Sequence, residues 1–149
     1  MRAIIQRVKE ASVKIDGKVH EQIGSGMMVL LGICKEDQQK DLEWMSRKIV
    51  NMRIFGDDDG KINLNIRDTA GEILLISQFT LYASTKKGNR PSFIKAAGPE
   101  IAKPLYLEFI NTLSEEGIIV RSGIFGADMK VSLINDGPVT IIIDSKTKE

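Results

Sequence analysis

Histidine and cysteine are nearly absent from this sequence, which contains one of each, His20 and Cys34. A single cysteine cannot form an internal disulfide, and a zinc cluster of several cysteine and histidine ligands is not available. A Ser-His-Asp triad would depend on His20, which lies among polar residues in a strand-like segment, and no G-x-S-x-G motif is present. We therefore interpret His20 as a surface residue and expect neither a bound metal nor a cofactor.

Long apolar runs and an excess of one charge are also absent. No apolar run approaches the length of a membrane span, and the N-terminal segment lacks the continuous apolar core of a signal peptide. The net charge is +1, which argues against non-specific nucleic-acid binding over the whole surface. These features predict a cytoplasmic protein with no membrane partner, and they still allow a local basic patch.

The pattern that is present is typical of one mixed α/β domain. The 149 residues show no repeat, linker or domain boundary, so we expect a single domain over residues 1–149. Strand-like and helix-like segments follow one another in the order β-β-β-α-β-α-β-β-β. This order predicts two packed sheets in a barrel-like arrangement, with a layer of two helices on one side.

The strands are predicted from apolar alternation and turn residues. Residues 2–15 and 18–23 form a hairpin through Asp16-Gly17, because Asp-Gly favours the tight turns that join antiparallel strands. The other expected strands cover residues 27–33, 72–83, 118–122, 129–134 and 139–144.

Two helices are predicted from apolar spacing and end signals. Leu42, Met45, Ile49 and Met52 recur at helical spacing, with Asp37 as the expected N-cap. The second helix covers residues 98–117, opening near Pro99 and closing on Gly117. Pro104 lies inside it, so we expect either a kink or a later start.

The segment "NDGPVT", residues 135–140, raises a separate question. Asp136-Gly137 predicts a hairpin turn, but Pro138 lacks the N–H that a returning strand would use. One interpretation is a turn on an edge strand. The other is a segment that presents backbone atoms to a ligand.

Polar side chains also end the expected strand 72–83. Alternation places Ser77, Gln78 and Thr80 on an element whose first half is apolar on both faces. Buried polar groups need partners, which neighbouring loops or a ligand would supply. The strand end is therefore a candidate site.

A basic loop follows this strand, over residues 84–95. It contains Lys86, Lys87 and Arg90 and no acidic residue, so it is either a solvated loop or a binding segment for phosphates. Phe93 and Phe125 are candidates for stacking on a base, or for packing in the core.

These motifs together resemble one family, the D-aminoacyl-tRNA deacylases. The resemblance rests on "SQFTL" at 77–81, "RPSF" at 90–93 and "FGADMKVSLINDGPVT" at 125–140, and it extends from the N-terminal "IIQRVKEASV" to about Ile143. It implies a homodimeric hydrolase that cleaves the ester between a D-amino acid and the terminal ribose of tRNA. D-aminoacyl-tRNA is then the expected partner, with no DNA partner.

The resemblance also implies the roles of individual residues. A cis Gly137-Pro138 bond is expected to reach into the partner subunit's site, bind the substrate ammonium through backbone carbonyls and exclude L-amino acids by a clash. Glycyl-tRNA is expected to escape this filter in part. The implied site residues are Ser77, Gln78, Phe79 and Thr80 for catalysis, Gly137, Pro138, Thr140, Met129, Phe125 and Arg7 for substrate binding, and Lys86, Lys87 and Arg90 for tRNA binding.

Two chemical routes remain open at this point. Thr80 is either a nucleophile, which needs a nearby base, or a positioning residue. In the second case the ribose 2′-hydroxyl helps water to attack, and backbone N–H groups near Gln78 and Phe79 stabilise the oxyanion. We favour the second route because the motif is poor in titratable groups.

Three alternative functions remain open. The protein could be a non-catalytic tRNA-binding module, an editing enzyme for a mischarged L-amino acid, or a merely structural protein.

Overall fold

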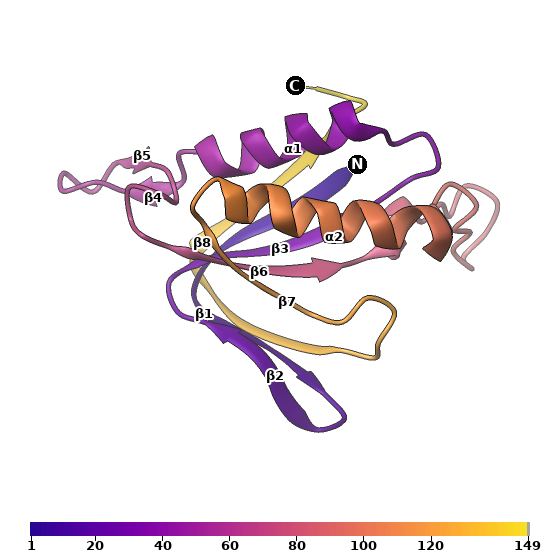
Figure 1. Ribbon diagram of the computed structural model, residues 1–149, viewed down its shortest axis with the longest axis horizontal. Helices are drawn as coiled ribbons and strands as arrows, with labels where there is room; N and C mark the ends of the chain where they lie inside the picture. Colours follow the sequence, from indigo (N-terminus) through magenta and orange to yellow (C-terminus); the bar gives the residue numbers. More distant parts are fainter. Residues whose placement is uncertain (149) are drawn as a thin grey trace.

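The fold is organised around its first strand, which pairs with three others in one curled sheet (Figure 1). The computed structural model describes residues 1–148. In chain order the elements are β1 (Arg2–Ile15), β2 (Lys18–Ile23), β3 (Gly26–Gly32), α1 (Gln39–Asn51), β4 (Phe55–Gly56), β5 (Ile62–Leu64), β6 (Glu72–Ser77), the 3-10 helix η1 (Phe79–Tyr82), α2 (Pro99–Glu115), β7 (Ile119–Ser122) and β8 (Lys130–Asp144).

The sheet combines antiparallel and parallel pairs. β2 and β3 run one after the other along one edge of β1, and β8 runs along the other edge. β3, β6 and β7 are parallel, so each needs a crossover, and α1 and α2 lie in these connections. β4 and β5 form a small separate sheet.

Apolar side chains fill both faces of the sheet. One face carries Ile5, Val29 and Leu75 and packs against apolar residues of the helices such as Met45 and Phe109. The other face forms a second core inside the curl, built from Val8, Ala11, Val13, Ile23, Met28, Leu74 and Ile76. The mixed α/β class, the barrel-like arrangement and the layer of two helices are therefore confirmed. The two expected sheet layers are the two halves of one curled sheet.

Two features of the helices differ from the sequence patterns. The N-cap of α1 is Gln38, so the assignment of Asp37 is wrong. The reason is that Asp37 is buried and binds the α-amino group of Met1 and the N–H of Cys34. α2 begins at Pro99 and continues through Pro104, which lies early in the helix and removes only one backbone hydrogen bond.

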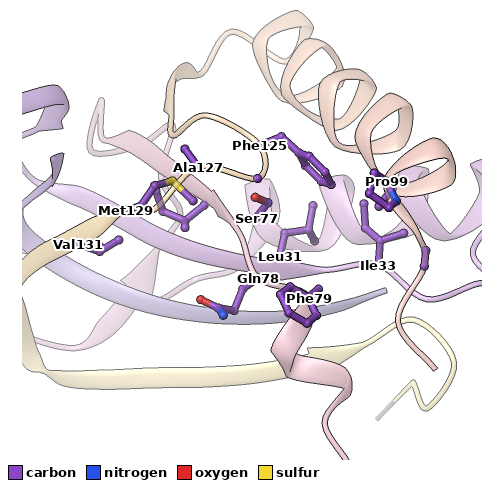
Figure 2. Close-up of a pocket in the computed structure, with 14 residues that line it drawn as sticks. Leu31, Ile33, Ser77, Gln78, Phe79, Pro99, Phe125, Ala127, Met129 and Val131 are labelled. Atoms are coloured by element: carbon purple, nitrogen blue, oxygen red, sulfur yellow. The ribbon is translucent and has the colours of Figure 1, made fainter. Parts of the chain in front are cut away.

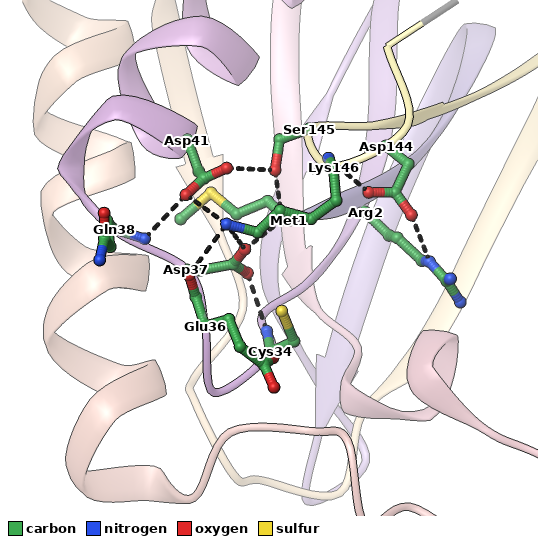
Figure 3. Close-up of polar contacts among 10 residues, drawn as sticks. All are labelled: Met1, Arg2, Cys34, Glu36, Asp37, Gln38, Asp41, Asp144, Ser145 and Lys146. Atoms are coloured by element: carbon green, nitrogen blue, oxygen red, sulfur yellow. Dashed lines mark hydrogen bonds and ion pairs between the residues drawn. The ribbon is translucent and has the colours of Figure 1, made fainter.

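A buried polar network joins the chain's first residue to α1 and to the segment after β8 (Figure 3). The amine of Met1 donates to Asp37 at 2.5 Å and to Ser145 Oγ at 2.6 Å. Ser145 donates in turn to Asp41, which also accepts from Lys146 at 2.7 Å. The network fixes the start of β1 relative to the end of β8.

β8 is one strand, so the hairpin predicted at Asp136-Gly137 is wrong. Both halves of β8 pair with β1, and the register shifts on either side of Val8, opposite the Gly-Pro segment. The pairing with a distant strand overrides the local turn signal, and the segment becomes an irregularity within the strand.

The strand expected over residues 72–83 is also too long. β6 ends at Ser77, where its partner β3 ends as well. The N–H of Gln78 makes the last contact, to Leu31 O at 2.8 Å. With no further partner strand the chain turns into η1, and the predicted alternation of side chains beyond Ser77 does not occur.

Candidate active site

A cavity of about 540 Å³ opens at the carboxyl ends of β3 and β6, beside the start of α2 (Figure 2). This is the edge at which open parallel sheets usually bind ligands. The cavity is lined by Leu31, Ile33, Ile76, Ser77, Gln78, Phe79, Ala97, Pro99, Ala102, Phe125, Gly126, Ala127, Met129 and Val131. None of these side chains is an acid, a base or a thiol.

Two aromatic side chains border the cavity and are held by packing. Phe79 is 56% exposed and meets Phe93 edge to face, with ring centroids 5.1 Å apart. Phe125 packs against Tyr106 with ring centroids 5.8 Å apart, and the Tyr106 hydroxyl donates a hydrogen bond to Leu75 O at 2.9 Å. A flat apolar group entering the cavity would therefore meet ring surfaces on two sides.

Polar groups at the cavity come from the side chains of Ser77 and Gln78 and from the backbone where β6 ends. Because η1 starts at Phe79, the N–H groups of Phe79 and Thr80 have no acceptor within that helix. The N–H of Gln78 is already bound to Leu31, so it is not the free donor that the sequence suggested. The Thr80 hydroxyl accepts a hydrogen bond from Gln78 Nε2, and Thr80 does not line the cavity.

The Gly137-Pro138 segment is exposed and is held in place from β1. Its peptide bond is cis, and Arg7 donates from Nε to Asp136 O at 2.9 Å. A second Arg7 nitrogen donates to Ile54 O at 2.7 Å. Gly137 has φ +134°, and a Cβ built on it would lie 2.9 Å from Arg7 Nη2, so only glycine fits here.

Side chains on either side complete this segment. Asn135 accepts from the N–H of Val139 at 3.0 Å and donates to Thr140 Oγ1 at 3.0 Å. Gln6 donates to the same hydroxyl at 3.1 Å. The loop is thus braced internally and from β1, while Pro138 faces solvent.

Within one chain the residues predicted for catalysis and substrate binding, Thr80 apart, form two separate groups. Ser77, Gln78, Phe79, Phe125 and Met129 line the cavity, whereas the second group does not. The second group comprises Arg7, Gly137, Pro138 and Thr140. Arg7 pairs with Met27, four residues from the cavity residue Leu31, which corresponds to about 13 Å along β3.

The sequence matches one family of known proteins over almost its full length. The family model described as D-Tyr-tRNA(Tyr) deacylase matches residues 4–144. A D-aminoacyl-tRNA deacylase of Christiangramia forsetii is 60% identical over 149 residues, covering 99% of each chain. A D-aminoacyl-tRNA deacylase of Flavobacterium psychrophilum is 59% identical, and the alignment covers the whole of both chains. The chain belongs to the D-aminoacyl-tRNA deacylase family. The resemblance and the enzyme class predicted from its motifs are confirmed.

Two solved structures share this fold. A structure titled c-Myc DNA Unwinding Element Binding Protein superposes with a TM-score of 0.91 at 44% identity, covering 97% of this chain and 98% of its own. A probable eukaryotic D-amino acid tRNA deacylase superposes with a TM-score of 0.80 at 18% identity, over 95% and 97% of the two chains. The second likeness bears on the fold alone.

The basic loop of this deacylase-family chain leaves the cavity region beside Phe79. Its ends are joined by two hydrogen bonds of 2.9 Å between Ser84 and Ser92. Lys86, Lys87 and Arg90 are exposed, and none has an acidic partner among residues 1–148. The same part of the chain contains no cluster of three potential metal ligands, and neither helix is long and apolar enough to cross a membrane.

Sequence reasoning missed the apolar half of the site. Leu31 and Ile33 lie at and just after the end of β3, and Ala97, Pro99 and Ala102 lie just before and at the start of α2. These residue types are equally common in any core, so no local signal marks them. The carbonyl of Ile54, which accepts from Arg7, carries no side-chain signal at all.

Proposed function

We propose that the protein hydrolyses the ester bond of D-aminoacyl-tRNA, releasing the D-amino acid and free tRNA. The observation that carries the proposal is the cavity at the end of β6, in a chain that matches this deacylase family over residues 4–144. Its volume suits an aminoacyl group and part of the terminal adenosine. Phe79 and Phe125 offer ring surfaces for stacking, and the basic loop lies where the rest of the acceptor end would leave.

The cavity lining supports attack by water. It contains no histidine, carboxylate or lysine to act as a base, and Thr80 lies outside it. The ribose 2′-hydroxyl, next to the ester, is then the group that assists the water. As the tetrahedral intermediate forms, the carbonyl oxygen becomes an oxyanion, and the free N–H of Phe79, at the cavity, is the backbone donor proposed to stabilise it. Thr80 fixes the side chain of Gln78.

The two separate groups of site residues support a dimer. An isologous two-fold contact would bring the exposed Gly137-Pro138 segment of one subunit to the cavity of the other, twice per dimer. The hydrogen bonds from Arg7 and Asn135 give the segment the rigidity that such a contact needs. Each active site would then use both chains.

Chiral selection would follow from the backbone of this segment. Its carbonyl oxygens accept from the substrate ammonium, which fixes the amino group and the ester together. The side chain of a D-amino acid then points outward, and that of an L-amino acid meets the Gly-Pro backbone. Many D-amino acids are accepted, and glycyl-tRNA, which lacks a side chain, is cleared to some extent.

The test is a side-by-side deacylation assay with D-tyrosyl-tRNA and L-tyrosyl-tRNA. We expect release of D-tyrosine and near-complete survival of the L-ester. The matched variant Ser77→Phe, which fills the cavity, should release neither amino acid. Equal rates on both esters would refute the proposed selectivity, and binding of tRNA without release would identify a non-catalytic binding module.

A further inference from the structure

The outer face of α1 carries a stripe of basic residues around the chain's single tryptophan. Lys40, Trp44, Arg47, Lys48 and Asn51 recur at three- and four-residue spacing, so they share one side of the helix. The buried residues of α1, such as Leu42, Met45 and Ile49, face the opposite way into the core. The stripe is therefore directed at solvent, with Trp44 half-buried in its centre.

Cations surround the indole of Trp44. Lys48 Nζ lies 5.9 Å from the ring centroid, and Lys148 Nζ lies 5.2 Å from it. Trp44, Arg47, Lys48, Asn51 and Met52 line a shallow hollow of about 390 Å³. Among residues 1–148, neither Arg47 nor Lys48 is engaged in an ion pair, so their charges are available to a ligand.

This stripe begins close to the basic loop beside the cavity. The segment before α1 contacts the end of the loop through an isolated antiparallel β-bridge between Cys34 and Ala96. The N–H of Lys35 also donates to Lys95 O at 3.4 Å. Figure 1 shows the loop and the N-terminal end of α1 at the same end of the molecule. These backbone contacts place Lys95, in the basic loop, next to Lys35, five residues before Lys40 at the start of α1, with exposed Glu36 between Lys35 and Lys40.

We infer that the outer face of α1 is a second contact surface for tRNA, which binds the phosphate backbone beyond the acceptor end and stacks an unpaired base on Trp44. This inference rests on the proposed function, because a substrate whose ester lies in the cavity must continue across the outside of the protein. Lys and Arg bind phosphates with little regard to sequence, and an indole stacks on any base. A 13-residue helix extends the contact by about 20 Å.

The direct test is a fluorescence titration of the protein with uncharged tRNA at several salt concentrations. Trp44 is the only tryptophan, so its emission reports on this face alone. We expect saturable quenching, and a salt slope that falls by about 2 in the Arg47→Gln/Lys48→Gln variant. The control is Lys14→Gln/Lys18→Gln, which removes the same charge from the β1–β2 hairpin and should keep the parent slope. Unchanged emission, or a parent slope in the Arg47/Lys48 variant, would overturn the inference.

Kinetics separate this inference from the proposed activity. We expect the Arg47/Lys48 variant to raise KM several-fold on full-length D-tyrosyl-tRNA and to leave cleavage of D-tyrosyl-adenosine unchanged. If the parent cleaves neither substrate, the proposed function fails while the fluorescence titration still decides on the binding face. If the parent cleaves both and the variant keeps its KM, the binding face is refuted. Quenching by phosphatidylglycerol vesicles but not by tRNA would also refute it.

Discussion

Arg7 donates a hydrogen bond from Nε to the carbonyl oxygen of Asp136 at 2.9 Å, directly before the Gly137-Pro138 bond. The contact links β1 to the irregular part of β8, and the bond from Arg7 to Ile54 O fixes the guanidinium from the other side. The conformation of the exposed segment therefore depends on a residue more than a hundred positions earlier in the chain.

Arg7→Lys should weaken this link. A lysine has one ammonium group and cannot reach both carbonyls in the same geometry, so we expect a loss of about 2 kcal/mol in unfolding free energy. Discrimination between D- and L-tyrosyl-tRNA should fall as the segment loosens. Urea denaturation and the paired deacylation assay measure the two effects. Arg53→Lys is the control, because exposed Arg53 also donates to a backbone carbonyl, that of Asn63. Equal effects of both variants would contradict a specific role of Arg7.

Gly137→Ala should displace the segment without unfolding the protein. Its Cβ would lie 2.9 Å from Arg7 Nη2 and 2.9 Å from Val139 Cγ2, so the loop must move. We expect deacylation of the D-ester to fall at least tenfold, as about 1 Å of misplacement costs more than that in many enzymes. Gly88→Ala is a matched control for stability, because Gly88 has φ +137° and no atom within 4 Å of the added Cβ. Full activity of Gly137→Ala would show that the segment is not part of the site.

Phe79→Pro and Phe79→Ala together isolate one backbone donor. Both remove the ring, but only proline removes the N–H, and the first position of a helical turn tolerates proline. We expect kcat of the proline variant to be lower by about 10² to 10³ relative to the alanine variant. Similar kcat values for the two would show that this amide does not stabilise the oxyanion.

Thr80→Ala should retain most of the activity, whereas substrate ending in 2′-deoxyadenosine should react poorly. The Thr80 hydroxyl is bound to Gln78 and lies outside the cavity lining. In the proposed mechanism it is the 2′-hydroxyl of the ribose that assists the attacking water. Single-turnover assays with both substrates measure the two effects. Isolation of an acyl-enzyme on Thr80, with the folded alanine variant inactive, would establish the nucleophilic route.

Mixing two inactive variants should restore activity if the sites are shared between subunits. A Gly137→Ala subunit keeps an intact cavity, and a Ser77→Phe subunit keeps an intact Gly-Pro segment. After random exchange, about a quarter of the parent's sites would combine two intact halves. Deacylation by the exchanged mixture, with sedimentation of the dimer, measures this. A fully active monomer of the parent protein would contradict it.

Asp41 should make stability depend on acidic pH. Burial alone would raise the pKa of Asp41, but hydrogen bonds from Lys146 and the Gln38 amide lower it to about 2. A carboxylate with a lowered pKa stabilises the fold above its unfolded value of 3.8, and this contribution is lost as the pH falls toward 2. The shift corresponds to about 2 kcal/mol at neutral pH.

Denaturation of Asp41→Asn at pH 7, 4 and 2 tests this. The variant should be less stable than the parent at pH 7, and the difference should shrink below pH 4. Glu43→Gln, which changes an exposed carboxylate on the same helix, is the control and should match the parent throughout. A difference that persists at pH 2 would exclude the charge of Asp41 as its cause.

Local patterns predicted much of the fold. The Asp16-Gly17 hairpin, the buried strand β3 and both helices follow from turn residues and from the spacing of apolar side chains within each segment. Two of the errors have a common physical cause, which is a partner distant in the sequence. β8 stays continuous because β1 pairs with both of its halves, and Asp37 is drawn away from the helix cap by the amine of Met1.

The candidate site also contains residues that local sequence patterns predict and residues that they do not. Ser77, Gln78 and Phe79 could be predicted because their motif is specific, and the structure places them at a cavity. The apolar lining from β3 and α2 could not, because Leu31 or Ala102 differs from any core residue only by its position in space.

β8 carries residues of both halves of the proposed site, so the number of residues between them in the strand is constrained. Val131, at its start, lines the cavity of its own chain, while Gly137 and Pro138 lie six and seven residues further along the same strand. Inserting one residue between them would move the loop by about 3.3 Å and turn the intervening side chains to the opposite face. In the proposed dimer the strand would therefore set the distance between the pocket of one subunit and the Gly137-Pro138 segment that the same subunit offers to its partner, and we expect β8 to tolerate substitutions far better than changes in length.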